Sequence, residues 1–123
     1  MYNIILIGLS GAAGAVSRYG VNQYVSHHFG SNLLGTFFAN TSGSFLLGLF
    51  IGMIASHTNW SNEIRLVVAV GFLGSYTTFS TLTVDTIQLI QKGELYTAGL
   101  NLVASVVIGL FAAMLGLFVG KYI

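Results

Sequence analysis

Hydroxyl side chains gather in one short apolar stretch, GFLGSYTTFSTL, at residues 71–82. Between its second glycine and its final leucine stand six hydroxyl-bearing residues: Ser75, Tyr76, Thr77, Thr78, Ser80 and Thr81. Hydroxyl groups donate hydrogen bonds, and the carbonyl groups of an unwound backbone bind cations. Residues of these types at this spacing therefore favour the binding of a small ion over bond-making chemistry.

Enzyme chemistry has few residues to support it in this sequence. No nucleophile–base pair, phosphate-binding loop or pair of carboxylates stands at a recognisable spacing. The absence of cysteine excludes thiolate metal sites. His27, His28 and His57 are expected in loops and lack the spacing of metal ligands on one helix face. We expect a protein that is not an enzyme.

The composition indicates an integral membrane protein. Of the 123 residues, 54% are hydrophobic and only 6% are charged, against about 25% charged residues in soluble domains. Because so few charged side chains cannot cover a water-facing surface, we expect the protein to lie in a lipid bilayer. The net charge of +1 gives no reason to expect a nucleic-acid partner.

Four segments are long and apolar enough to cross a bilayer, at residues 3–24, 33–55, 64–91 and 95–121. They predict an all-α protein with one four-helix transmembrane domain over residues 1–123. The hydroxyl-rich stretch lies midway along the third segment, and we predict that this helix is broken near the membrane midplane. The alternative is a continuous helix whose hydroxyl groups bond back to preceding carbonyls.

Small residues recur at helical spacing in the second and fourth segments. One ladder consists of Ser44, Gly48 and Gly52, and the other of Ala112, Gly116 and Gly120. Such ladders let helix backbones approach closely in a membrane. Four helices make a thin bundle, so a partner subunit is also expected.

A few polar side chains remain inside the apolar segments. Asn40, Asn101 and Ser105 predict a polar lane along the bundle, although a lone Asn also serves to pair helices. Arg18 and Asp85 lie towards segment ends, where they either anchor the helix or attract an ion.

The basic residues are balanced across the predicted membrane. Arg65 and Lys121 fall on one side, and Arg18 and Lys92 fall on the other. A balanced count gives no preferred orientation, so the chain is expected to insert either way up.

Three motifs in this order resemble the Fluc (CrcB-type) fluoride channels over the whole chain. GFLGSYTTFST is similar to their third-helix signature, and GAAGAVSRYG at 11–20 is similar to their first-helix glycine and arginine motif. GTFFANTSGSFLLG at 35–48 resembles their second-helix motif with its asparagine. The resemblance implies an antiparallel, dual-topology dimer in a prokaryotic plasma membrane. Its two pores would export fluoride passively and confer fluoride resistance.

The resemblance also implies roles for single residues. Backbone carbonyls matching Gly74 and Thr77 would hold a structural sodium ion between the subunits, and we expect Gly74 to need unusual backbone angles. Asn40 and Phe79 match the fluoride pathway. Further hydrogen-bond donors for that pathway are Ser80, Thr81, Ser105 and Asn101, and Arg18 is a candidate vestibule or pairing charge.

One position departs from the family pattern. Leu82 stands where a second phenylalanine is usual, which leaves open a heterodimer whose other subunit supplies that ring. The balanced charges instead favour a homodimer. Two other functions also remain. A four-helix multidrug-type exporter would need an embedded carboxylate, for which only Asp85 is available. A non-transporting membrane scaffold would leave the broken helix unexplained.

Overall fold

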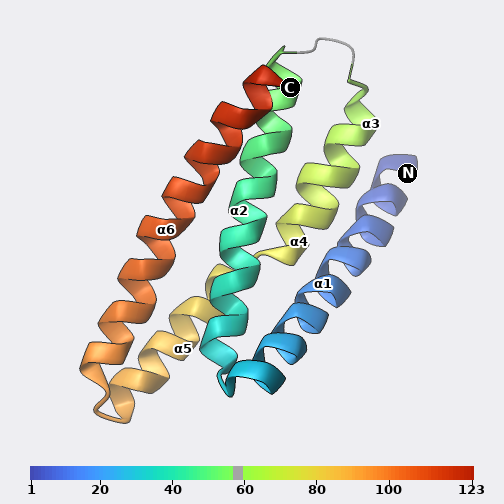
Figure 1. The fold of residues 1–123 in the computed structure, drawn as a ribbon. Helices are drawn as coiled ribbons and strands as arrows, with labels where there is room; N and C mark the ends of the chain where they lie inside the picture. Colours follow the sequence, from blue (N-terminus) through green and yellow to red (C-terminus); the bar gives the residue numbers. More distant parts are fainter. Residues whose placement is uncertain (57–59) are drawn as a thin grey trace.

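The computed structural model describes residues 1–56 and 60–123, so His57 lies outside the described part. The helices are α1 (Tyr2–Phe29), α2 (Asn32–Ser56), α3 (Asn62–Arg65), η1 (Leu66–Leu73), α4 (Gly74–Tyr76), α5 (Phe79–Gln91) and α6 (Leu95–Tyr122) (Figure 1). Elements α3 to α5 together form the third of four segments long and apolar enough to cross a membrane. The predicted all-α fold with four spans is confirmed.

The first helix is longer than the sequence suggested. It ends at Phe29 because Gly30 adopts a left-handed conformation (φ 67°) and donates its N–H to the Ser26 carbonyl at 2.8 Å. His27 and His28 therefore lie in the last turn of α1 rather than in a loop, and both are exposed. Arg18 is 11 residues before the end of α1, which is about 16 Å at a helical rise of about 1.5 Å per residue. It therefore lies deeper in the span than the sequence predicted.

The break in the third span is confirmed at Thr77 and Thr78. Both have extended backbone, with φ −86° and ψ 156° at Thr77 and φ −149° and ψ 114° at Thr78. The π-helix η1 precedes the break, and the Gly74 N–H at its end bonds to the Ala69 carbonyl five residues earlier. The sequence did not indicate this π-helix, because π-helices are rare and have no clear residue signal.

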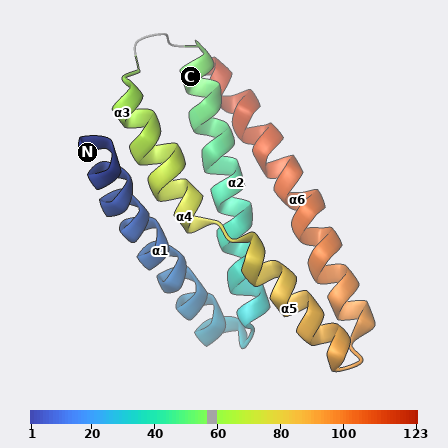
Figure 2. The same cartoon turned by 180° about the vertical axis from the view of Figure 1, so that it is seen from behind.

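The break lets the third span pack on two different neighbours. The first half, through η1 and α4, packs against α1, whereas α5 packs against α6. Figure 2 shows the span passing across α2 at the break. A straight helix would stay beside one neighbour, so the break is also what brings α5 to α6.

The predicted ladders of small residues bring α2 and α6 into backbone contact. A Cβ atom on Gly116 would collide with the Phe45 carbonyl, and one on Gly120 would collide with the Leu49 carbonyl. From the other side, a Cβ on Gly52 would lie 2.6 Å from the Leu117 carbonyl oxygen. These contacts replace the hydrophobic driving force that lipid does not provide between helices.

Replacing Gly116 with valine should force α2 and α6 apart. We expect a loss of about 1–3 kcal/mol of stability, as for overpacked cores, or no folded protein at all. Thermal unfolding in detergent measures this effect. Gly99→Val is the matched control, because it lies on the same helix and no heavy atom lies within 4 Å of its added Cβ. Equal unfolding temperatures would contradict the close contact.

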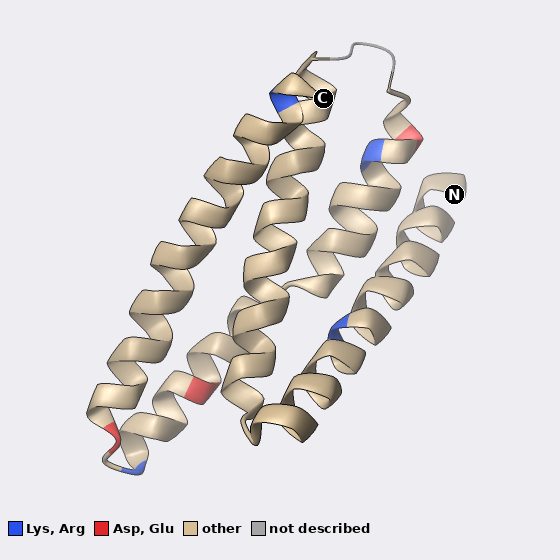
Figure 3. Ribbon diagram, viewed as in Figure 1, with Lys and Arg blue, Asp and Glu red and all other residues tan. Residues whose placement is uncertain are grey.

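Charged residues are sparse and lie mostly near the ends of the bundle (Figure 3). Arg65 ends α3 and Lys121 lies in the last turn of α6, at the end that carries both chain termini (Figure 1). Lys92 follows α5 at the other end. The structure thus places Arg65, Lys121 and Lys92 at the predicted ends, whereas Arg18 lies inside α1.

A candidate ion site at the helix break

Asn40 holds the break through two hydrogen bonds to one residue. The backbone N–H of Thr78 donates to Asn40 Oδ1 at 2.7 Å, and Asn40 Nδ2 donates to the Thr78 carbonyl at 2.9 Å. The amide of Asn40 thus acts as a local substitute for backbone and satisfies groups that the break exposes. Its second Nδ2 hydrogen has no acceptor among the described residues.

A cluster of hydroxyl groups starts α5. Thr78 is the N-cap: its Oγ1 accepts the Thr81 N–H at 3.3 Å and lies 3.0 Å from Thr81 Oγ1 and 3.3 Å from Ser80 Oγ. Since α5 is 13 residues long and begins inside the bundle, its N-terminus directs a partial positive charge to this depth.

A groove of about 390 Å³ opens beside the break, between α2, α5 and α6. Polar and apolar side chains share its walls: Asn40, Gly43, Ser44, Leu47, Thr77, Thr78, Phe79, Leu82, Ser105, Val106, Gly109, Leu110 and Ala113. It therefore brings together three of the candidate pathway residues, Asn40, Phe79 and Ser105.

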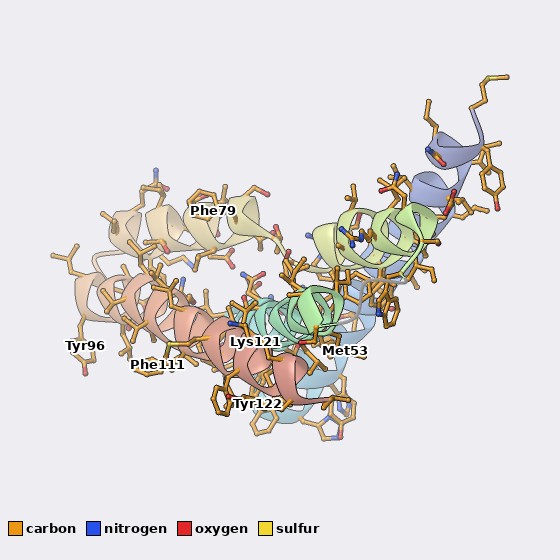
Figure 4. All side chains as sticks on the ribbon, turned by 90° about the horizontal axis from the view of Figure 1, so that it is seen from above. Met53, Phe79, Tyr96, Phe111, Lys121 and Tyr122 are labelled. Atoms are coloured by element: carbon orange, nitrogen blue, oxygen red, sulfur yellow. The ribbon has the colours of Figure 1, made fainter. Side chains whose placement is uncertain are left out.

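These groove residues differ in their surroundings. The hydroxyl oxygen of Ser105 is buried and has no hydrogen-bond partner among the described residues, so it remains able to donate to a ligand. Phe79 projects from α5 with 74% of its surface exposed (Figure 4), whereas Leu82, one turn later, is only 5% exposed. The aromatic side of the site thus consists of one ring, and Leu82 fills the second position with an aliphatic side chain.

Four candidate residues lie outside this groove. Ser80 and Thr81 use their hydroxyl groups in the cluster at the start of α5. Asn101 donates to Thr86 Oγ1 at 3.1 Å and lines a separate groove with α2 residues nearer the start of that helix. Arg18 lies on α1 and makes no ion pair within the described residues. The predicted polar lane is therefore divided between two grooves.

The two predicted cation ligands lie at the ends of the last helical turn before the break: Gly74 begins α4, and Thr77 follows it. Gly74 has ordinary helical angles (φ −62°, ψ −31°), so the expected unusual backbone at this residue is wrong. A glycine is not required by this chain, since an added Cβ would meet only the Ala69 carbonyl oxygen, at 3.4 Å. No described donor bonds to the carbonyl of Gly74 or Thr77. Both oxygens are therefore free to bind a cation.

Side-chain metal sites offer no alternative in the described part of the chain. It contains no group of three or more His, Asp or Glu residues placed to hold a metal ion. Backbone carbonyls suit a hard cation, and those at the break fit that requirement. Sequence reasoning missed that Asn40 pairs with Thr78. The signal was an amide in one span opposite a span rich in hydroxyl residues.

Comparison with known proteins gives one consistent result. A family model described as "CrcB-like protein, Camphor Resistance (CrcB)" matches residues 5–117. A protein of Hydrogenovibrio crunogenus named "Fluoride-specific ion channel FluC" is 40% identical over 119 residues, covering 96% of this chain and 90% of the relative. A protein of the same name from Allorhizobium ampelinum is 39% identical over 124 residues, covering 100% and 99%. A "Fluoride-specific ion channel FluC 1" of Methanosarcina acetivorans is 38% identical over 116 residues, covering 94% and 88%.

These matches extend over all four spans and over every residue of the groove at the break. The chain is a multi-pass protein of the plasma membrane, and it belongs to the CrcB-like family.

Proposed function

We propose that this chain forms a fluoride-selective channel that lets fluoride leave the cell passively, down its electrochemical gradient. The names of its relatives support fluoride as the transported ion. The observation that carries the proposal is the groove at the break, where Asn40 and Ser105 offer uncommitted hydrogen-bond donors beside Phe79. A groove that offers hydrogen-bond donors and is lined by no carboxylate suits an anion, because nothing in its lining repels a negative charge.

Fluoride is small and strongly hydrated, so a pathway must replace its water with other donors. The second Nδ2 hydrogen of Asn40 and the hydroxyl of Ser105 are available for this purpose. The positive edge of the Phe79 ring and the N-terminus of α5 add favourable electrostatic potential at the same depth. A narrow lane of such groups would exclude the larger chloride ion by size.

The carbonyls of Gly74 and Thr77 would hold a structural sodium ion. When bound, this ion would supply a positive charge that lowers the energy of an anion near the membrane midplane. Hard cations take about six or more oxygen ligands, more than the two carbonyls of one chain. A second subunit would therefore have to contribute its own carbonyls.

That second subunit would be another copy of this chain, inserted in the opposite orientation. Figure 2 shows no helix of the described residues over the face of the break opposite α2, and Gly74 and Phe79, which flank the break, are both exposed in the single chain. Such a pair would contain two pores and lie in the lipid bilayer. The balanced charges support identical chains, because partners of fixed orientation need opposite charge biases. A heterodimer remains the alternative that Leu82 suggests.

Gly74→Val tests whether a second chain approaches this glycine. Within one chain an added Cβ meets only a carbonyl at ordinary contact distance, so the helices should still form. A branched side chain facing a second copy should separate the subunits. We expect circular dichroism close to wild type and a shift from dimer to monomer on size exclusion. Thr77→Ser, which keeps the carbonyl and the hydroxyl, should remain a dimer. A dimeric Gly74→Val would contradict this interface.

A pH gradient distinguishes a channel from the multidrug-type exporter. That exporter would need a carboxylate in its pathway, and Asp85 is not among the groove residues. We expect fluoride to leave liposomes containing the purified chain at the same rate whether the interior is more acidic, more basic or equal in pH. A rate that follows the pH gradient would overturn the channel and support the exporter. No flux at all would support the scaffold.

A further inference from the structure

The hydrogen bond from the Thr78 N–H to Asn40 marks the residue at which the helix break begins. In a continuous α-helix each N–H donates to the carbonyl four residues earlier. Thr77 still does so, donating its N–H to the Leu73 carbonyl at 3.2 Å. The next N–H in the chain, that of Thr78, would donate to Gly74, but it donates to Asn40 Oδ1 at 2.7 Å instead. The break therefore starts where Asn40 takes over a backbone donor.

This exchange frees the Gly74 carbonyl. Its regular donor, the Thr78 N–H, is occupied by Asn40, and no other described donor replaces it. If Asn40 released Thr78, the helical bond to Gly74 could close by one more residue. The Gly74 oxygen would then be engaged within its own chain and would be a poorer cation ligand.

The same bond also sets the direction of the Thr77 carbonyl. That carbonyl and the Thr78 N–H belong to one planar trans peptide group, in which they point in opposite directions. Since the N–H points to Asn40 on α2, the Thr77 carbonyl points away from α2. On the side of the break away from α2, Figure 2 shows no other helix of the described residues. The hydrogen bond from the Thr78 N–H to Asn40 thus determines both that the Gly74 carbonyl is free and where the Thr77 carbonyl points.

We infer that Asn40 is the positioning residue of the cation site: by holding the Thr78 N–H, it releases the Gly74 carbonyl and aims the Thr77 carbonyl outward. This inference rests on the proposed function, because it deepens the assignment of these carbonyls to sodium. It separates two tasks within one side chain. Oδ1 holds the Thr78 N–H, whereas the second Nδ2 hydrogen stays available beside the groove that Asn40 lines.

The test is sodium-dependent stability rather than transport. An ion that binds only the folded protein raises the unfolding temperature of that protein as the ion concentration increases. Unfolding of the purified chain in detergent is therefore followed as sodium chloride replaces N-methylglucamine chloride at constant ionic strength. We expect wild type to be stabilised by sodium, and Asn40→Leu to need at least about tenfold more sodium for half of the effect. That factor corresponds to about 1.4 kcal/mol.

Asn40→Asp is the conservative variant that separates the two tasks. Its carboxylate still accepts the Thr78 N–H but cannot donate to the Thr78 carbonyl as Asn40 Nδ2 does. Because the inference assigns the cation site to the accepted N–H, sodium should still stabilise this variant. Its negative charge beside the groove should nevertheless stop fluoride flux. If Asn40→Leu does not fold, the aspartate variant alone decides: loss of sodium-dependent stabilisation in Asn40→Asp would overturn the inference, because this variant keeps the acceptor for the Thr78 N–H.

Asn101→Leu is the matched control. It also exchanges an amide for an apolar side chain, and it removes a bond to Thr86 that lies away from the break. Its sodium dependence should equal that of wild type. An equal weakening in Asn101→Leu and Asn40→Leu, or no sodium dependence in wild type, would overturn the inference. Because the readout needs no transport, a channel without fluoride flux would instead count against the proposed function.

Discussion

Two lysines in place of His27 and His28 should abolish fluoride flux when that variant is expressed alone. Both residues are exposed in the last turn of α1, where added cations are compatible with the helix dipole. The added charge breaks the balance between the two sides and fixes one orientation. Without oppositely oriented copies, an antiparallel dimer cannot form. Fluoride efflux from liposomes containing the purified variant measures the loss.

Co-expression provides the control for this experiment. A second variant carries Thr58→Lys and Asn59→Lys in the connection between the second and third spans, outside the described residues. It is biased in the opposite sense and should also be inactive alone. Expressed together, the two variants should regain wild-type flux. If the first variant keeps full activity alone, the antiparallel arrangement is wrong.

Phe79→Ile should reduce fluoride flux to the level of protein-free liposomes while the chain remains a dimer. The side chain is 74% exposed in a single chain, so little packing is lost within the fold. Isoleucine is apolar and of similar bulk, but it lacks the positive ring edge that can face an anion. Flux at equal reconstituted protein and size exclusion in detergent measure the two properties separately.

Leu82→Phe is the informative companion to that variant. It adds the second aromatic ring that the resemblance to the fluoride channels implies, at a residue that already lines the groove. We expect it to be tolerated and to keep or raise the flux, with the groove providing room for the ring. Unchanged flux in Phe79→Ile would show that the ring only packs against neighbours and that the ion path lies elsewhere.

The sequence predicted the architecture well because bilayer physics constrains it strongly. Span length follows from membrane thickness, and the spacing of Gly48, Gly52, Gly116 and Gly120 correctly indicated close helix contact. The six hydroxyl residues within the stretch 71–82 correctly indicated a break. These features depend on local sequence, so they can be read without coordinates.

The details of the site depend on pairing across the bundle and could not be read in this way. A sequence shows that Asn40 needs a partner but not that both partners belong to the backbone of Thr78. For the same reason, the sequence does not show that the hydroxyl groups of Ser80 and Thr81 meet that of Thr78 at the start of α5. The sequence predicted unusual backbone angles at Gly74, but the residue is helical, because the extended backbone of the break begins three residues later at Thr77.

Selective fluoride efflux from liposomes that contain only this purified chain is the most direct measurement of the central claim. Parallel samples are loaded with potassium fluoride or potassium chloride, and valinomycin carries the compensating potassium current. We predict rapid release of fluoride and retention of chloride without any pH gradient. Equal release of both anions, or fluoride release no faster than from protein-free liposomes, would contradict a fluoride-selective channel built by this chain.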